Sequence, residues 1–222
     1  MGPGVGGADL ARIAPGATGI VLAGGRSTRF GSDKLAAEVD GAPLLHHPVL
    51  RLAEVCREVL VVVAPGAQEP ALPMAIATRV VHDATEGEGP LAGVLAGLME
   101  AVTDWALVAG GDMPDLRTSV LLEMLRVAGE SGADAVALQD ADRIRPLPLV
   151  LRSAPAREAA HALLHSGERR LRALPDALRT AVLDEPTWLA LDPDRATLRD
   201  VDEPGDLGGM TERPVTPEAD LE

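Results

Sequence analysis

Aromatic residues are nearly absent from this sequence: its 222 residues include two Trp, one Phe and no Tyr. The core must therefore be built from Leu, Val, Ala and Ile, and recognition of bases by aromatic stacking platforms is not expected. Positive charge is also scarce, because the formal net charge is −14. Since phosphate contacts dominate nucleic-acid binding, no nucleic-acid partner is expected. Any phosphate that the protein binds must be held by local positive groups or by a metal ion.

Cysteine and long apolar runs are equally rare. Cys56 is the only cysteine, so a disulfide framework cannot form, which favours a reducing compartment. No apolar run reaches the roughly 20 residues of a membrane span. Residues 1–16 also lack the charged start and apolar block of a secretory signal. We therefore expect a cytoplasmic protein with no membrane partner.

Short apolar runs alternate with segments of helical periodicity along the middle of the chain. This alternation predicts an α/β fold with three Rossmann-like layers, in which helices cover both faces of a mainly parallel sheet. The predicted strands are 18–23, 59–64, 105–109, 133–138, 146–151 and 181–183, and the predicted helices are 45–56, 91–102, 120–128 and 156–165.

The two ends of the chain differ in composition from the middle. Residues 1–16 are rich in Gly, Pro and Ala, and residues 211–222 combine prolines with scattered acidic side chains, so both are predicted to be disordered. No repeat and no linker interrupts residues 17–210. This stretch is long enough to bury a substantial core and is predicted to form a single domain.

A glycine-rich loop, LAGGRSTRFGSDK at residues 22–34, follows the first predicted strand. Glycines let the backbone approach a phosphate chain, and Arg29 and Lys34 add positive charge. Lys34 is the only lysine among 20 basic residues, which indicates a position that needs a compact ammonium rather than a planar guanidinium. The spacing matches neither a P-loop nor a dinucleotide-binding fingerprint. The alternative interpretation is a surface turn with incidental charges.

A second loop, GGDMP at residues 110–114, follows the strand predicted at 105–109. Both loops come after strands of a parallel sheet, so they are expected at the edge where α/β folds bind ligands. The carboxylate of Asp112 is there a candidate ligand of Mg²⁺. Asp115 is predicted to cap the next helix. The alternative for Asp112 is a role in a turn.

An acidic segment near the C-terminus, DVDEPGDL at residues 200–207, is the third candidate. On an extended segment Asp200 and Asp202 point to the same side, which makes the pair a candidate source of a second metal ligand. We take Asp202 as that ligand. The alternative is an acidic cap of a helix that starts at Pro204.

Together these motifs resemble the molybdenum cofactor guanylyltransferase (MobA-type) family of Rossmann-like nucleotidyltransferases, over about residues 18–209. The resemblance implies a fold of the nucleotide-diphospho-sugar transferase type, with a nucleotide half at about 17–132 and an acceptor half at about 133–210. It also implies a catalytic role for Arg29, Lys34 and Asp112, and Mg²⁺ binding by Asp112 and Asp202. The nucleotide-binding residues that it implies are Leu22, Ala23, Gly24, Gly25, Lys34, Asp83, Gly89, Pro90, Leu91 and Asp112.

The narrower likeness to the guanylyltransferases comes from two segments, RPLPLV at 145–150 and SGERR at 166–170. It implies that their arginines face an anionic pterin phosphate. The alternative is that these arginines are solvated side chains on exposed helices. The acceptor-binding residues that the resemblance implies are Arg145, Glu168, Arg169 and Arg170.

Three departures from the family pattern bear on the substrate rather than on the reaction. Leu147 stands where members often have His or Gln. No Asn follows the strand that contains residues 61–63, and Asp-Val-Asp at 200–202 replaces the Asn-Val-Asn of some members. The resemblance therefore supports nucleotidyl transfer more strongly than it supports one acceptor.

The reaction implied by the resemblance is transfer of GMP from GTP to the terminal phosphate of molybdopterin, with release of pyrophosphate. The implied partners are GTP, molybdopterin, and a molybdoenzyme or its chaperone that receives the product. Three alternatives stay open: a molybdopterin cytidylyltransferase, another guanylyl- or sugar-phosphate nucleotidyltransferase, and a nucleotide-binding protein without catalysis.

Two other features are expected to be structural. His161 and His165 lie four residues apart on a predicted helix, but no third ligand accompanies them, so an exposed helix face is predicted. Cys56 is predicted to be a core thiol on the apolar stripe of a helix.

Overall fold

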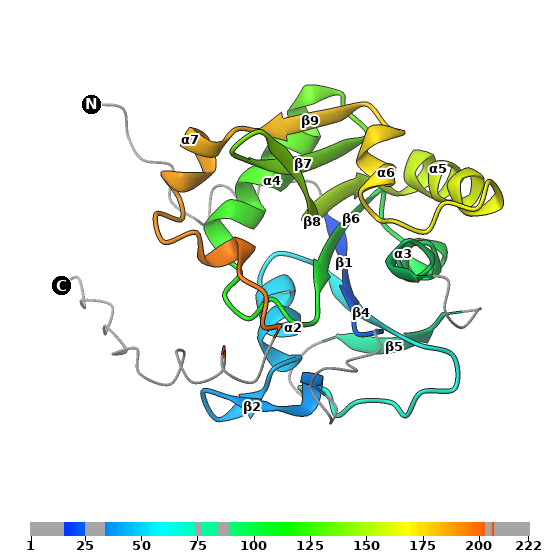
Figure 1. Ribbon diagram of the computed structural model, residues 1–222, viewed down its shortest axis with the longest axis vertical. Helices are drawn as coiled ribbons and strands as arrows, with labels where there is room; N and C mark the ends of the chain where they lie inside the picture. The colour runs from blue at the N-terminus through cyan, green and yellow to red at the C-terminus, as the bar shows by residue number, and fades with distance from the viewer. Residues whose placement is uncertain (1–15, 25–33, 74–76, 84–88, 203–205, 207–222) are drawn as a thin grey trace.

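One mixed sheet runs through the centre of the computed structural model, which describes residues 16–24, 34–73, 77–83, 89–202 and 206 (Figure 1). Its seven strands lie in the order β5-β4-β1-β6-β8-β7-β9. They are β1 (Ala17–Leu22), β4 (Glu58–Val63), β5 (Thr78–His82), β6 (Trp105–Gly110), β7 (Ala135–Asp140), β8 (Arg143–Arg152) and β9 (Thr180–Leu183).

Neighbouring strands of this sheet pair in parallel except along β8, which is antiparallel to both β6 and β7. β1, β4 and β6 lie inside the sheet and are buried almost throughout, which is why they appear in the sequence as continuous apolar runs. β8 follows β7 through a tight turn in which Ala141 has a φ of 52°. The predicted three-layer α/β fold is confirmed.

Helices cover both faces of the sheet, and Figure 1 shows them on its two sides. On one face α2, α4 and α7 pack against the sheet around buried residues such as Leu52 and Trp188. On the other face α3, α5 and α6 pack around residues such as Leu91 and Leu174. Their bounds are α2 (His46–Ala53), α3 (Gly89–Glu100), α4 (Thr118–Ser131), α5 (Ser153–His165), α6 (Ala173–Asp176) and α7 (Glu185–Leu189).

The helix α3 packs unusually close to the sheet because of one glycine. A Cβ atom at Gly97 would lie 2.7 Å from Cγ2 of Ile20, on the central strand β1. Ile20 is fully buried, so it has little room to move away. This close approach fixes the start of α3, at Gly89, beside the carboxyl end of the sheet.

Several predictions about local structure were wrong. α2 ends at Ala53, so Cys56 lies after the helix, where it packs against the apolar cluster of that face. Asp115 does not cap α4, because the helix begins only at Thr118, with Arg117 at the N-cap and no side-chain cap. The carboxylate of Asp115 instead lies 3.5 Å from the guanidinium of Arg199.

Other elements were not predicted from the sequence. β5 is an edge strand with exposed side chains, so it lacks the apolar run that marks a buried strand. A small hairpin is formed by β2 (Glu38–Val39) and β3 (Ala42–Pro43), with only two residues in each strand. Two 3₁₀ turns, η1 (Lys34–Ala36) and η2 (Ala196–Leu198), complete the described elements.

Two further expectations concern surfaces and chain ends. His161 and His165 are both exposed on α5, as predicted. Residues 1–15 and 211–222, the bulk of the predicted disordered ends, lie outside the described residues. Within the described part of the chain, no helix is long and apolar enough to cross a membrane.

Candidate functional site

The loops singled out in the sequence meet at the carboxyl edge of the parallel strands. The N–H of Gly111, just after β6, donates to the carbonyl oxygen of Leu22 at the end of β1, with an N···O distance of 3.0 Å. Ala23 donates in the same way to Val62 of β4 at 2.8 Å, and the N–H of Asp83, after β5, donates to Val63 at 2.9 Å. Backbone bonds therefore connect the ends of four strands into one rim.

Three charged side chains converge at this rim. The ammonium nitrogen Nζ of Lys34 lies 3.0 Å from Oδ2 of Asp112 and 3.4 Å from Oδ1 of Asp202. The Lys34 side chain is only 10% exposed, whereas those of Asp112 and Asp202 are 34% and 69% exposed. Residues that are far apart in the sequence thus place one cation and two carboxylates at a single point, with the carboxylates open to solvent.

Two consecutive glycines are required directly before Asp112. A Cβ atom at Gly110 would lie 2.6 Å from Oδ1 of Asp112, and one at Gly111 would lie 3.1 Å from the carbonyl oxygen of Leu22. Either contact would displace the Asp112 carboxylate or separate the two loops. The pair of glycines before Asp112 therefore has a steric reason in this fold.

The acidic segment near the C-terminus reaches the site by a backbone contact. Val201 donates its N–H to the carbonyl oxygen of Asp112 at 2.9 Å. The Val201 side chain is buried beneath the β2–β3 hairpin, in a small apolar cluster with Val39 and Leu44. Residues 200–202 pair with no strand of the sheet; the burial of Val201 between Asp200 and Asp202 holds both at the rim.

Asp200 shares the electrostatic surroundings of the other carboxylates. Burial raises the pKa of its carboxyl, and the negative charges of Asp202 and Asp112 raise that pKa further. Arg145, on β8, acts in the opposite direction. The first residues of β8 lie at this edge because β8 runs antiparallel to β6.

A divalent cation fits the geometry of the carboxylate pair. Asp112 and Asp202 each place one oxygen within 3.4 Å of a single positively charged nitrogen, so both can approach one cationic centre. Mg²⁺ usually takes one or two protein carboxylates and completes its shell with water and substrate phosphates. No group of three or more His, Cys, Asp or Glu side chains that could hold a metal occurs among the described residues. The site therefore suits a cation that is shared with a phosphate-bearing substrate.

The residues implied for nucleotide binding surround the same rim. Leu22 and Ala23 are half-buried and Gly24 is exposed at the end of β1, while Asp83 is half-buried after β5. Gly89 and Pro90 are exposed and Leu91 is buried in the first turn of α3. Residues 25–33 of the glycine-rich loop, which include the predicted site residues Gly25 and Arg29, lie outside the described residues.

The start of α3 is in direct contact with the segment implied for acceptor binding. Gly89 has a φ of 79°, and a Cβ atom there would lie 3.0 Å from the carbonyl oxygen of Arg169. The two segments thus form neighbouring parts of one surface. No pattern in the sequence predicts this contact, because Gly89 and Arg169 belong to separate motifs far apart in the chain.

Within the acceptor segment, the charges of Glu168 and Arg170 offset one another. The Glu168 carboxylate accepts hydrogen bonds from the backbone N–H groups of Arg169 and Arg170 and from the guanidinium of Arg170. These bonds hold the pKa of the Glu168 carboxyl well below its usual range. The Arg169 guanidinium donates to the carbonyl oxygen of Leu164 at 2.8 Å.

Arg145 is placed differently. Its guanidinium lies 3.7 Å from Oδ2 of Asp140 and its side chain is 37% exposed. Its buried Nε atom has no hydrogen-bond partner among the described residues. Of the four predicted acceptor-binding residues, Arg145 therefore differs in carrying a buried Nε without a partner among the described residues, while its partly exposed side chain lies near the site edge.

The chain is similar to known proteins over most of its length. The family model described as "MobA-like NTP transferase domain" matches residues 19–181. A probable molybdenum cofactor guanylyltransferase of Chloroflexus aggregans is 33% identical, and the match covers 86% of this chain and 91% of the relative. A molybdenum cofactor guanylyltransferase of Burkholderia vietnamiensis is 36% identical, over 73% of this chain and 83% of the relative.

Solved structures are similar to the whole fold. The molybdopterin-guanine dinucleotide biosynthesis protein A of Archaeoglobus fulgidus superimposes with a TM-score of 0.69 at 20% identity, over 87% of this chain and 96% of that protein. The 2-C-methyl-D-erythritol 4-phosphate cytidylyltransferase of Thermus thermophilus superimposes with a TM-score of 0.63 at 18% identity, over 86% and 95%. At these identities the likeness concerns the fold alone.

Proposed function

Because the chain belongs to the MobA-like NTP transferase family, we propose that it transfers GMP from GTP to the terminal phosphate of molybdopterin and releases pyrophosphate. Its relatives in Chloroflexus aggregans and Burkholderia vietnamiensis are named as molybdenum cofactor guanylyltransferases, which supports this choice of nucleotide and acceptor. The single structural observation that carries the proposal is the meeting of Lys34, Asp112 and Asp202 at the carboxyl edge of the sheet.

The reaction is an in-line displacement at the α-phosphorus. An oxygen of the acceptor phosphate forms a new bond to the α-phosphorus. The bond from the α-phosphorus to the oxygen that bridges it to the β-phosphorus breaks, and pyrophosphate leaves with that electron pair. A phosphate oxygen is already anionic near neutral pH, so the step needs no strong general base. Catalysis then consists of positioning the two phosphates and neutralising their charge.

We assign a separate role in this reaction to each charged side chain. Asp112 and Asp202 hold Mg²⁺, which supplies positive charge to the triphosphate oxygens when it is bound. Lys34 binds the phosphate chain and stabilises the charge that develops on the leaving pyrophosphate, because its ammonium already lies at the same rim. Arg29, in the same loop, is assigned to the phosphates as well.

We assign the nucleotide to the ends of β1, β4 and β5, beside the start of α3. Leu22, Ala23, Gly24 and Gly25 contact it from one side. Asp83 and the first turn of α3, Gly89 to Leu91, contact it from the other. Residues 17–132 thus form the nucleotide half of one domain, and residues 133–210 the acceptor half.

The acceptor phosphate is assigned to Arg145 and to the segment of Glu168, Arg169 and Arg170. Arg145 contributes positive charge through its side chain, which is 37% exposed. Glu168 fixes the segment through its hydrogen bonds to two backbone amides, so that its role is structural support rather than contact with an anion. The product then passes to a molybdoenzyme or to its chaperone.

A panel of nucleotides tests the proposal. Pyrophosphate release is measured with GTP, CTP, ATP and UTP in turn, each with and without molybdopterin, in the presence of Mg²⁺. We expect release only with GTP and only when molybdopterin is present. Release with CTP alone among the four would instead identify a cytidylyltransferase, and tight GTP binding without turnover for any acceptor would identify a nucleotide-binding protein.

A further inference from the structure

We propose that Arg117 and Asp192, which no motif singled out, are positioning residues that hold Asp202 in register with Asp112. Two segments are involved: the Asp112 loop, residues 111–117, and the C-terminal strap, residues 191–202. In Figure 1 the strap is the orange segment that leaves α7 and runs toward the β2–β3 hairpin. The inference rests on the proposed function only in giving Asp112 and Asp202 a shared cation.

Asp192 organises the strap itself. Its carboxylate is 1% exposed and accepts the N–H groups of Ala196 at 3.1 Å and of Thr197 at 2.7 Å, which closes the turn that begins η2. A carboxylate buried to this degree is stable only if it is paired and hydrogen-bonded. The two amides provide the hydrogen bonds to the Asp192 carboxylate, and a positive charge must provide the pairing.

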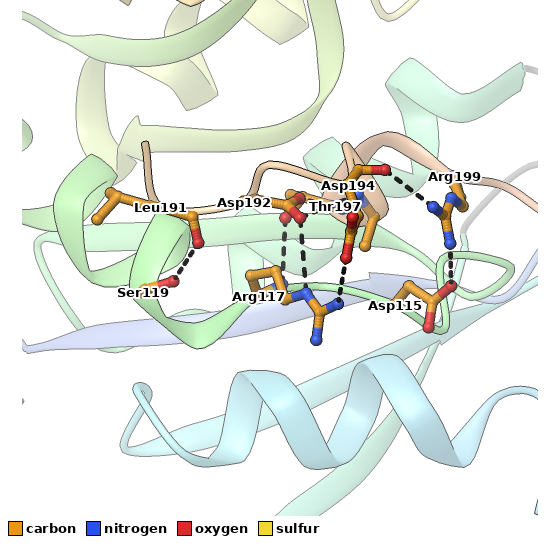
Figure 2. Close-up of polar contacts among 9 residues, drawn as sticks. Asp115, Arg117, Ser119, Leu191, Asp192, Asp194, Thr197 and Arg199 are labelled. Carbon is orange, nitrogen blue, oxygen red and sulfur yellow. Dashed lines mark hydrogen bonds and ion pairs between the residues drawn. The ribbon is translucent and has the colours of Figure 1, made fainter. Parts of the chain in front are cut away.

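Arg117 supplies that charge from the end of the Asp112 loop. Its Nε lies 3.6 Å from Oδ1 of Asp192 and its Nη2 lies 4.0 Å from Oδ2 of Asp194, as Figure 2 shows. Its backbone N–H also donates to the Thr197 hydroxyl at 3.2 Å. One residue of the loop therefore contacts three residues of the strap, through both its side chain and its backbone.

A second ion pair lies closer to the site. The guanidinium of Arg199 is 3.5 Å from the carboxylate of Asp115 and donates to the carbonyl oxygen of Asp194 at 2.8 Å (Figure 2). Arg199 immediately precedes Asp200, and Asp115 is in the Asp112 loop. The attachment thus continues along the strap toward the residues proposed to act on the substrate.

The attachment ends at the Asp112 backbone, where Val201 donates its N–H to the Asp112 carbonyl oxygen at 2.9 Å. Asp202, the next residue, is 69% exposed and meets Lys34 at 3.4 Å, so its side chain has little packing of its own. Its backbone is held on one side by the strap and on the other by a hydrogen bond from its N–H to the Asp206 carboxylate at 2.9 Å. A displacement of about 1 Å is enough to impair a site of this kind, and contacts several residues away therefore become relevant to it.

Each of these contacts is weak by itself. The inference depends on the fact that several of them join the same two segments. Half-exposed ion pairs each contribute little. Arg126 provides the comparison: it lies within α4, the helix that follows Arg117, and is held by Glu123 and Glu130 through ion pairs that stay within the helix. A role that consists only of stabilising α4 would make Arg117 and Arg126 equivalent.

Hydrogen exchange of the intact, ligand-free protein tests the inference without any turnover. We compare the Val201 amide in Arg117→Ala and in the matched control Arg126→Ala. Because the Val201 N–H is protected by its bond to Asp112, its exchange is expected to become at least about tenfold faster in Arg117→Ala. The amides of Ile20 and Val21 in β1 keep their rates, and Arg126→Ala leaves Val201 unchanged. Unchanged Val201 exchange in Arg117→Ala, or equal acceleration in both variants, overturns the inference.

The second measurement is the affinity for Mn²⁺, used as a probe for the divalent site and followed by electron paramagnetic resonance in the presence of GTP. Arg117→Ala and Asp192→Asn are expected to weaken Mn²⁺ binding by about 10–100-fold, whereas Arg126→Ala binds as the unmodified protein does. Arg117→Lys restores part of the affinity because it keeps the charge. If one of these variants unfolds, Arg199→Gln is measured in its place. This variant removes the half-exposed ion pair with Asp115 and is also expected to weaken Mn²⁺ binding.

The two measurements also separate this inference from the proposed function. Suppose that Val201 exchanges faster in Arg117→Ala but that neither the variants nor the unmodified protein binds Mn²⁺. That result contradicts the metal site and leaves the attachment of the strap to the Asp112 loop intact. Normal Mn²⁺ binding in Arg117→Ala together with loosened Val201 overturns the positioning role.

Discussion

The Lys34 ammonium lies 3.0 Å from the Asp112 carboxylate, although 78 residues separate the two in the chain. Lys34 begins the short turn that follows the glycine-rich loop, and Asp112 follows β6. The Lys34 side chain is nearly buried, so its charge is directed at the carboxylates rather than at solvent. The first prediction concerns this ion pair.

Replacing Lys34 by Ala is expected to lower the rate of pyrophosphate release by about 10²–10³-fold, because a positive charge at the phosphate chain is lost. Steady-state kinetics with GTP measure the effect, and circular dichroism checks that the fold is kept. Lys34→Arg is expected to restore only part of the rate, because a planar guanidinium does not replace a compact ammonium at a nearly buried position. A normal rate in Lys34→Ala would rule out a phosphate-binding role.

Asp112→Asn removes one negative charge with almost no change of shape. Activity is expected to fall by about 10²-fold or more and to require higher Mg²⁺, because an amide oxygen binds a divalent cation more weakly than a carboxylate. The matched control is Asp104→Asn, an exposed aspartate just before the opposite end of β6. An unchanged Mg²⁺ dependence in Asp112→Asn would contradict the metal site.

Gly97→Ala tests the close packing of α3 on β1. The new methyl group would lie 2.7 Å from Cγ2 of Ile20, so the free energy of unfolding is expected to drop by about 1–2 kcal/mol after allowance for the better helix propensity of Ala. Chemical denaturation measures the change. The control is Gly93→Ala on the same helix, whose nearest contact would be 3.3 Å, from Cδ2 of Leu22. Equal effects of both variants would contradict the steric argument.

Cys56 is expected to react slowly with thiol reagents in the folded protein. Burial raises the pKa of its thiol to about 12, so little reactive thiolate exists at pH 8. Labelling with a disulfide reagent should be roughly 10²–10³-fold slower than in the denatured chain. Because Cys56 is the only cysteine, the signal needs no assignment. Equally fast labelling of both forms would show that the thiol is accessible.

Glu168→Gln is expected to destabilise the protein in a pH-dependent way. The Arg170 guanidinium and two backbone amides lower the pKa of the Glu168 carboxyl. The stabilisation is therefore complete above the ordinary glutamate pKa of about 4.3 and is lost as the pH falls below it toward the folded value. The difference in urea midpoint between Glu168→Gln and the unmodified protein should be constant from pH 8 to 6 and shrink below pH 4. A constant difference down to pH 3 would contradict this cause.

The sequence predicted the interior strands better than it predicted the edge strand β5 and the ends of the helices. β1, β4 and β6 are buried on both faces and therefore had to be continuous apolar runs, which made them visible. β5, an exposed edge strand, had no such run. The cap predicted at Asp115 failed because α4 begins only at Thr118; the Asp115 carboxylate lies instead beside Arg199, which comes from a distant part of the chain.

By itself, the sequence determined the fold class and the loops at the carboxyl edge, because local periodicity and the direction of parallel strands suffice for both. Only the tertiary structure decided that Asp202 reaches the Lys34 ammonium, 168 residues away in the chain, and that Arg117 and Asp192 join the two segments behind it. Such contacts depend on the burial of Val201 and Asp192, and burial is a property of the whole folded chain that no short stretch of sequence specifies.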